Sequence, residues 1–128
     1  MAEHDLGRLI EALAPRLDQD LWVFVTLPKL PPDVDPLMTF REDEGVTCIL
    51  RPDDARRLGL PDVPAFRRIT LGVQSSLEAV GLTAAVAGAL TAVGISANVV
   101  AAFHHDHVFV PAGRAGEALD CLRQLGGG

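Results

Sequence analysis

The second half of the chain changes repeatedly between the two hydrophobic periods of regular secondary structure. Phe66–Val73 alternates apolar and polar residues, which is the two-residue period of a strand with one buried side. In Glu78–Gly94, apolar residues recur three or four positions apart and form the stripe of a helix, which Gly94 closes. Two strands and a last helix follow, at Ile95–Ala102, His107–Val110 and Ala115–Leu125. This half therefore reads as strand, helix, strand, strand, helix.

A polar break, Gln74–Ser76, separates the first of these strands from its helix. Ser75 and Glu78 have the spacing of a capping box, with Ser75 as the N-cap residue. A helix N-terminus also presents backbone N–H groups and a positive dipole end, which suit a ligand carboxylate. The residues alone leave both readings open: the serines cap the helix and bind nothing, or the turn holds a ligand.

The first half of the chain has a similar order of elements. Asp5 can cap a helix with an apolar face from Leu6 to Leu17, which Pro15 kinks or shortens. The remaining predicted elements are a strand, a hairpin and a short helix, at Leu21–Leu27, Leu37–Leu50 and Pro52–Leu58. Leu60–Pro64 is the most linker-like stretch, so we predict units at residues 1–62 and 63–128.

The residues of the second half carry a family resemblance. Val80–Asn98, followed by His105–Pro111, resembles an ACT domain, and it is most similar to the regulatory modules attached to aspartate kinases. The whole chain resembles small stand-alone proteins made of two such modules. In many ACT domains an acidic residue and then Pro-Gly precede the helix; here Glu78 and Gly81 are present, and Val80 stands in place of the proline.

The resemblance implies an α+β fold of two ferredoxin-like βαββαβ units, each with an antiparallel sheet packed on helices. The first half lacks an opening strand and the second lacks a closing one. Residues 66–73 lie between them, so we expect this strand to be shared or exchanged between the two units.

The resemblance also implies a ligand site, because ACT domains bind small ligands, usually amino acids, at this turn and along the following strand. On this chain the implied positions are Gln74, Ser75, Ser76, Leu77, Val80, Gly81, Leu82, Asn98, Val99 and Val100. Asn98 stands among aliphatic residues, so its amide needs a partner if it is buried. That partner is either the ligand or backbone at a sheet edge.

The segment His104–His107 permits three interpretations. It is a solvated turn, or a turn in which His105 and Asp106 contact the ammonium group of an amino acid. The third interpretation is a metal site, because alternation places His105 and His107 on one side. Only two imidazoles converge, which is fewer ligands than a structural metal site needs.

Composition excludes several classes of protein. The net charge is −6 and aromatic residues make up 5%, which argues against a nucleic-acid partner. The longest apolar run, Leu82–Val93, is too short to span a bilayer, and Met1–Asp5 lacks the pattern of a secretory leader. The two cysteines, Cys48 and Cys121, have no metal-binding spacing. We therefore expect a cytoplasmic protein with no membrane partner.

No set of nucleophile and base and no phosphate-binding glycine loop is present in the sequence. The leading hypothesis is a non-enzymatic sensor without a cofactor, which binds an amino acid and forms a homodimer. Two alternatives remain: an oligomerisation or protein-interaction module that has no ligand, and a histidine-based metal-binding protein.

Overall fold

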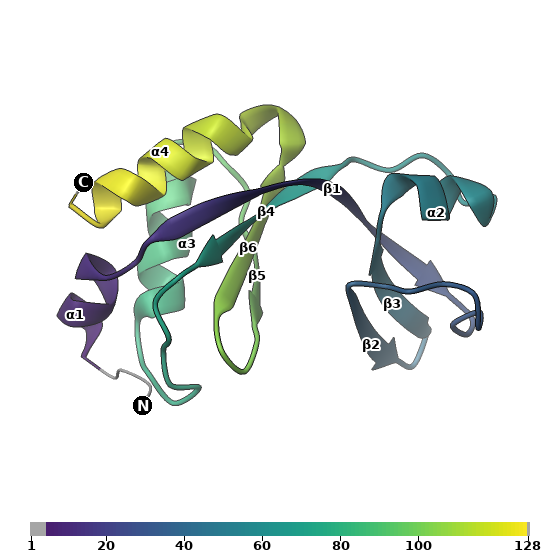
Figure 1. The fold of residues 1–128 in the computed structure, drawn as a ribbon, viewed down its shortest axis with the longest axis horizontal. Coiled ribbons are helices and arrows are strands. Elements are labelled where there is room, and N and C mark those ends of the chain that lie inside the picture. Colours follow the sequence, from purple (N-terminus) through teal and green to yellow (C-terminus); the bar gives the residue numbers. More distant parts are fainter. Residues whose placement is uncertain (1–4, 128) are drawn as a thin grey trace. The chain divides into compact units, whose positions relative to one another are not determined.

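The computed structural model describes residues 5–127, and Figure 1 shows its fold. Met1–His4, which belong to the polar opening, lie outside this range. In chain order the elements are α1 (Leu6–Glu11), β1 (Pro15–Leu27), β2 (Met38–Glu42), β3 (Gly45–Leu50), α2 (Pro52–Arg57), β4 (Phe66–Leu71), α3 (Leu82–Ala92), β5 (Asn98–Ala101), β6 (Asp106–Pro111), the 3₁₀ turn η1 (Ala112–Arg114) and α4 (Ala115–Leu125). Within residues 5–127, no helix has the length and hydrophobicity that a membrane span requires.

The chain divides into two compact units. The terminal unit contains the chain up to Gln19 and again from Arg67 onward, and the central unit is Asp20–Phe66. Strands β1 and β4 each begin in one unit and continue into the other. Phe66 at the start of β4 packs edge-on against Phe24 of β1 within the central unit, with ring centroids 5.4 Å apart. Both units therefore use residues of β4.

In the terminal unit, strands are hydrogen-bonded in the order β1-β4-β6-β5. The hairpin of β5 and β6 is antiparallel and pairs Asn98 with Phe109 and Ala101 with Asp106. Helix α3 connects β4 to β5, and β6 lies between these two strands. The missing closing strand of the second half is supplied by β1, from the start of the chain. The α+β, ferredoxin-like fold class is confirmed.

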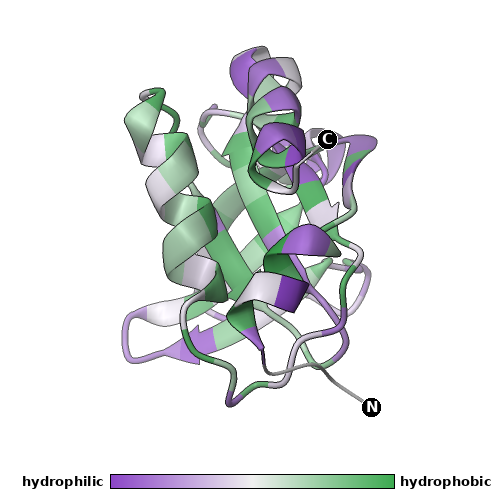
Figure 2. Cartoon of the chain, turned by 90° about the vertical axis from the view of Figure 1, so that its left-hand side faces the viewer, coloured by the Kyte–Doolittle hydropathy of each residue, from purple (hydrophilic) through white to green (hydrophobic). Residues whose placement is uncertain are grey.

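The core of the terminal unit lies between this sheet and its helices. Alternate residues of β4 and β6 are buried there, together with Leu82, Val86 and Leu90 of α3, so the predicted apolar stripe of α3 is confirmed. Figure 2 shows that α4 has a hydrophilic face, whereas the side of α3 that it presents is largely hydrophobic. The exposed residues of α3 include the small residues Ala84 and Gly88.

The central unit has the strand order β2-β3-β1, and both pairings are antiparallel. The predicted hairpin is confirmed: Met38 pairs with Ile49 and Glu42 with Gly45. Val23 and Leu27 of β1 pack with Cys48 and Leu50 of β3 and with Ala55 of α2. The residues of β2 are mostly exposed on both faces, so β2 contributes little to this core.

The first helix differs from its predicted extent. The helix α1 ends at Glu11, and a strand begins at Pro15, so the prediction that helix extends to Leu17 was wrong. Pro15 has no N–H group to continue a helix, and Ala14 takes a positive φ of 45° that turns the chain. Leu13 nevertheless enters the core of the terminal unit, where it is fully buried.

Candidate functional site

An open pocket of about 500 Å³ lies in the terminal unit, beside the loop that joins β4 to α3. Its wall comprises Gln74–Glu78 from this loop and Phe103 and His104 from the turn between β5 and β6. The fold brings these segments together because β4 and β6 are neighbouring strands. Four of the predicted site residues, Gln74, Ser75, Ser76 and Leu77, line this pocket.

Asp106 lies behind the pocket wall and is hydrogen-bonded to Ser75, which lines the pocket. The Ser75 hydroxyl donates a hydrogen bond to Oδ2 of Asp106 at 3.4 Å, and Asp106 is only 8% exposed. Burial raises the pKa of the Asp106 carboxyl, while the Ser75 hydrogen bond and the charge of His105 act in the opposite direction and lower it. The result is a poorly solvated carboxylate that gains from any additional cationic or N–H partner.

The helix that follows the pocket begins later than predicted. Gly81, not Ser75, is the N-cap residue of α3, so the predicted capping box was wrong. Ser75 bonds Asp106, and the Ser76 hydroxyl instead accepts a hydrogen bond from the backbone N–H of Glu78 at 3.1 Å. The helix cannot begin before Gly81, because a φ of 101° at this residue is not helical. Helical backbone therefore starts at Leu82.

The predicted positions at the start of α3 have different environments. Val80 is 83% exposed. Leu82 is 3% exposed and packs in the core, so its side chain is unavailable to a ligand and only its backbone can take part. A Cβ atom on Gly81 would lie 3.0 Å from Cδ2 of Leu6 in α1.

The predicted positions on β5 lie outside the set of residues that line the pocket. Asn98 is exposed, and its Nδ2 donates a hydrogen bond to the carbonyl oxygen of Phe109 on β6 at 3.3 Å. Val99 packs against the core of the terminal unit, and Val100 is half-buried opposite His107. The structure thus shows a backbone partner for the Asn98 amide, one of the two alternatives that the sequence left open.

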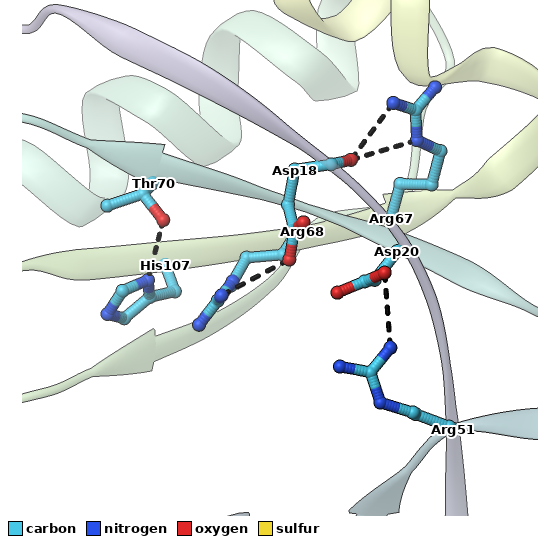
Figure 3. Close-up of polar contacts among 7 residues, drawn as sticks. All are labelled: Asp18, Asp20, Arg51, Arg67, Arg68, Thr70 and His107. Carbon is cyan, nitrogen blue, oxygen red and sulfur yellow. Dashed lines mark hydrogen bonds and ion pairs between the residues drawn. The ribbon is translucent and has the colours of Figure 1, made fainter. Parts of the chain in front are cut away.

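The histidines lie at the hairpin beside the pocket. The backbone carbonyl of His105 accepts a hydrogen bond from Ala102 at 3.1 Å, which closes the turn. His107 pairs through Nδ1 with the Thr70 hydroxyl at 3.0 Å (Figure 3). Burial, together with the charges of Arg68, His105 and Arg16, lowers the pKa of His107. Within residues 5–127, no three histidine, cysteine or acidic side chains converge as a metal site would require.

The two arginines of β4 are engaged with β1, as Figure 3 shows. Arg67 donates two hydrogen bonds to the backbone carbonyl of Asp18, at 3.1 and 2.9 Å, and Arg68 pairs with the Asp18 carboxylate at 3.2 Å. In the central unit, Arg51 and Asp20 form an ion pair of 3.1 Å. Each of these arginines holds neighbouring parts of its own unit together.

Sequence reasoning missed three residues of the pocket wall, namely Glu78, Phe103 and His104, as ligand contacts. Phe103 is 78% exposed. A large aromatic residue within a polar turn was the sequence feature that could have indicated a ligand contact there. Sequence reasoning also missed a smaller cavity of about 190 Å³ in the central unit, between α2, Leu21 and Val23 of β1, and residues 60–65.

Comparison with known proteins agrees with the fold. Residues 1–67 and residues 65–124 each match the sequence profile of an ACT domain. No curated protein matches this chain in sequence. A Vibrio cholerae protein of unknown function, described as a possible transport protein, is 42% identical, with a TM-score of 0.85 over 94% of this chain and 95% of that chain.

More distant structures are similar in fold alone. The regulatory subunit of aspartate kinase from Thermus flavus has a TM-score of 0.63 at 14% identity, over 87% of this chain and 95% of that one. The ligand-free form of the same subunit from Thermus thermophilus has a TM-score of 0.64 at 14% identity, over 89% and 97%. Because the two profiles together cover almost the whole sequence, the chain belongs to the ACT domain family.

Proposed function

We propose that this chain is a non-enzymatic sensor that binds an amino acid in the pocket of the terminal unit. The ACT family and the likeness to aspartate kinase regulatory subunits support a regulatory, ligand-binding role. The observation that carries the amino-acid assignment is Asp106, a buried carboxylate held by Ser75 on the pocket wall. Such a group gains most from a ligand ammonium ion, because burial has removed most of its water.

The other end of the amino acid is a carboxylate, which the start of α3 can accept. The first backbone N–H groups of a helix have no partner within the helix and carry its positive dipole end. The pocket lies on the loop that leads into this end. In this arrangement Gln74, Ser76, Leu77 and His105 surround the ligand, and Val80 and Gly81 flank its carboxylate. Asn98, Val99 and Val100 would come into contact with a ligand that extends along β5.

A ligand screen by thermal shift tests the proposal, since a ligand that binds only the native state raises the melting temperature. We expect at least one standard amino acid to stabilise the protein and Asp106→Asn to abolish that stabilisation. Asp120→Asn, an exposed carboxylate on α4, is the matched control and should leave the response unchanged. The absence of a response to every amino acid would refute the proposal.

We further propose that the two ACT-type units correspond to residues 1–62 and 63–128 and that the protein is a homodimer. Two features of the terminal unit support self-association: β5 is an edge strand, and the exposed side of α3 carries small residues such as Ala84 and Gly88. Light scattering at micromolar concentration is expected to give the mass of a dimer, and a monomeric mass would contradict it.

The rival function is a protein-interaction module without a ligand. The central unit supports it, because the edge strand β2 is exposed on both faces and Phe40 is 65% exposed. Retained dimerisation together with no response to any amino acid would favour this alternative. The same screen therefore separates the two functions.

A further inference from the structure

Two exposed apolar side chains face the same pocket from different segments. Phe103 is 78% exposed and Leu77 is 65% exposed, although both line the pocket wall. Leu77 comes from the loop before α3, and Phe103 from the turn between β5 and β6. Apolar surface exposed to water is stabilised when an apolar group covers it. These two side chains therefore supply a surface for the part of a ligand that is neither ammonium nor carboxylate.

The ionisable side chains around the pocket are acidic groups and histidines: His104 is on the wall, and His105 lies close enough to Asp106 to affect its pKa. Glu78 is on the wall, Asp106 lies behind Ser75, and none of the described residues that line the pocket is lysine or arginine. Arg67 and Arg68 are bound to Asp18, and Arg114 is bound to carbonyl oxygens at the opposite end of α3. The loop that forms the wall leads into the N-terminal, positive end of α3, to which the proposed function assigns the carboxylate common to all amino acids.

We infer that the ligand is an amino acid with an uncharged, apolar side chain, and that the pocket rejects aspartate and glutamate. This inference rests on the proposed amino-acid function. A second carboxylate would lose water beside Glu78 and Asp106 and would meet no lysine or arginine side chain on the described wall. A side-chain ammonium ion would have to lie against Leu77 and Phe103. Glu78 is exposed and so binds it weakly, and Asp106 already pairs with the ammonium group that all amino acids share.

Four ligands with unbranched side chains of similar length isolate this effect: norleucine, glutamine, glutamate and lysine. Their side chains are apolar, polar, anionic and cationic respectively, so size is nearly constant while chemistry changes. By calorimetric titration we expect norleucine to bind at least about tenfold more tightly than glutamine, and glutamate not to bind measurably. Glutamate or lysine binding as tightly as norleucine would overturn the inference.

Substitutions of Phe103 and Leu77 test whether these two side chains cause the preference for an apolar ligand. Phe103→Ala and Leu77→Ala should each weaken norleucine binding by about five- to tenfold, because each removes apolar surface from the contact. Binding of alanine, whose methyl group is too short to reach that surface, should not change. Phe40→Ala is the matched control, since Phe40 is also exposed but belongs to the central unit. Glu78→Arg adds a cation to the wall and should allow glutamate to bind.

The failure of this inference is distinguishable from failure of the proposed function. If no amino acid binds, the proposed function fails and the inference with it. If an amino acid binds and Asp106→Asn abolishes binding, but Phe103→Ala and Leu77→Ala leave norleucine affinity unchanged, only the side-chain assignment is overturned.

Discussion

The two ends of α3 differ in how their backbone groups are capped. At its C-terminal end, Gly94 has a φ of 74°, and the N–H groups of Gly94 and Ile95 bond the carbonyls of Thr91 and Leu90, each at 3.0 Å. Arg114 also donates hydrogen bonds to the carbonyl oxygens of Val93 and Gly94, at 3.0 and 2.9 Å. At the N-terminal end, Gly81 provides no side-chain cap, as far as the described chain shows, and the loop that lines the open pocket leads into it.

The comparison shows which end of a helix is available for function. Backbone carbonyls that already accept hydrogen bonds from Arg114 or from the glycine turn gain less from a ligand than groups without a partner do. A helix whose N-cap residue is glycine has no capping side chain, so its first N–H groups must bond water or a bound anion. The end of α3 whose carbonyls are bonded by Arg114 and the end to which we assign the ligand carboxylate are thus opposite ends.

The largest expected effect comes from a substitution at Gly81, the N-cap residue of α3. Gly81→Ala places a Cβ on a residue with φ of 101° and within 3.0 Å of Leu6. We expect it to lower the free energy of unfolding by about 1–3 kcal/mol, measured by chemical denaturation. Gly88→Ala is the control, because that position is helical with open space around it, and it should stabilise by up to about 1 kcal/mol. Equal stability of Gly81→Ala and the parent protein would contradict the structure.

The next effect is on pH dependence, through the raised pKa of Asp106. As the pH falls through that raised pKa, the carboxyl takes up a proton and can no longer pair with an ammonium ion, so norleucine affinity should fall. The stability of the ligand-free protein should change in the opposite direction. Because the folded state binds the proton more readily than the unfolded state does, stability rises as the pH falls through the same window.

Titration calorimetry and denaturation across this pH range measure both trends. Asp106→Asn should remove the contribution of this group to the pH dependence of stability. A ligand affinity that stays constant across the range would show that Asp106 is not the ammonium partner.

A smaller effect is expected at the C-terminal end of α3. Arg114→Ala removes the hydrogen bonds to Val93 and Gly94 and the ion pair with Glu117. The melting temperature should fall slightly, with amino-acid affinity unchanged, because the pocket is at the other end of α3. Arg123→Ala, on the last turn of α4, is the control. A loss of affinity in Arg114→Ala would show that the two ends are coupled.

The smallest effect is expected for Asn98→Ala. This exposed side chain bonds the carbonyl of Phe109, so its loss should cost about 0.5–1 kcal/mol of stability. Affinity should change little if the pocket wall carries the binding. A loss of affinity of about tenfold or more would place β5 in the ligand site, as the family resemblance implies. Denaturation and titration of the same variant separate these outcomes.

Local chemistry explains which elements were predictable. The helix α4, the hairpin of β2 and β3, and the glycine end of α3 follow from hydrophobic periods and turn residues within a few positions. The start of α3 did not follow, because Ser75 and Glu78 make a capping pattern that the left-handed turn at Gly81 overrides. The end of α1 was ambiguous for a similar reason, since Leu13 and Leu17 suit either a helix face or a strand.

The candidate site was predictable in part. Asp106 comes from the hairpin of β5 and β6 and Gln74–Leu77 from the loop before α3. The family resemblance indicates both segments, and the structure connects them through the Ser75 hydrogen bond. Phe103 and His104 were not predicted as pocket residues, because only the pairing of β6 with β4 places them next to the loop before α3. Such contacts join residues far apart in the chain, and no local period records them.

The sequence by itself determined the family, the order of most elements and the turn before α3 as the place to look for a ligand. These depend on residue spacing and on the conformations that glycine and proline allow or forbid. Only the tertiary structure decided that β1 closes the sheet of the terminal unit, that Asp18 engages Arg67 and Arg68, and that Phe103 lies on the pocket wall. Each of these outcomes depends on which distant surfaces are buried together, and hydrophobic burial has no direction along the chain.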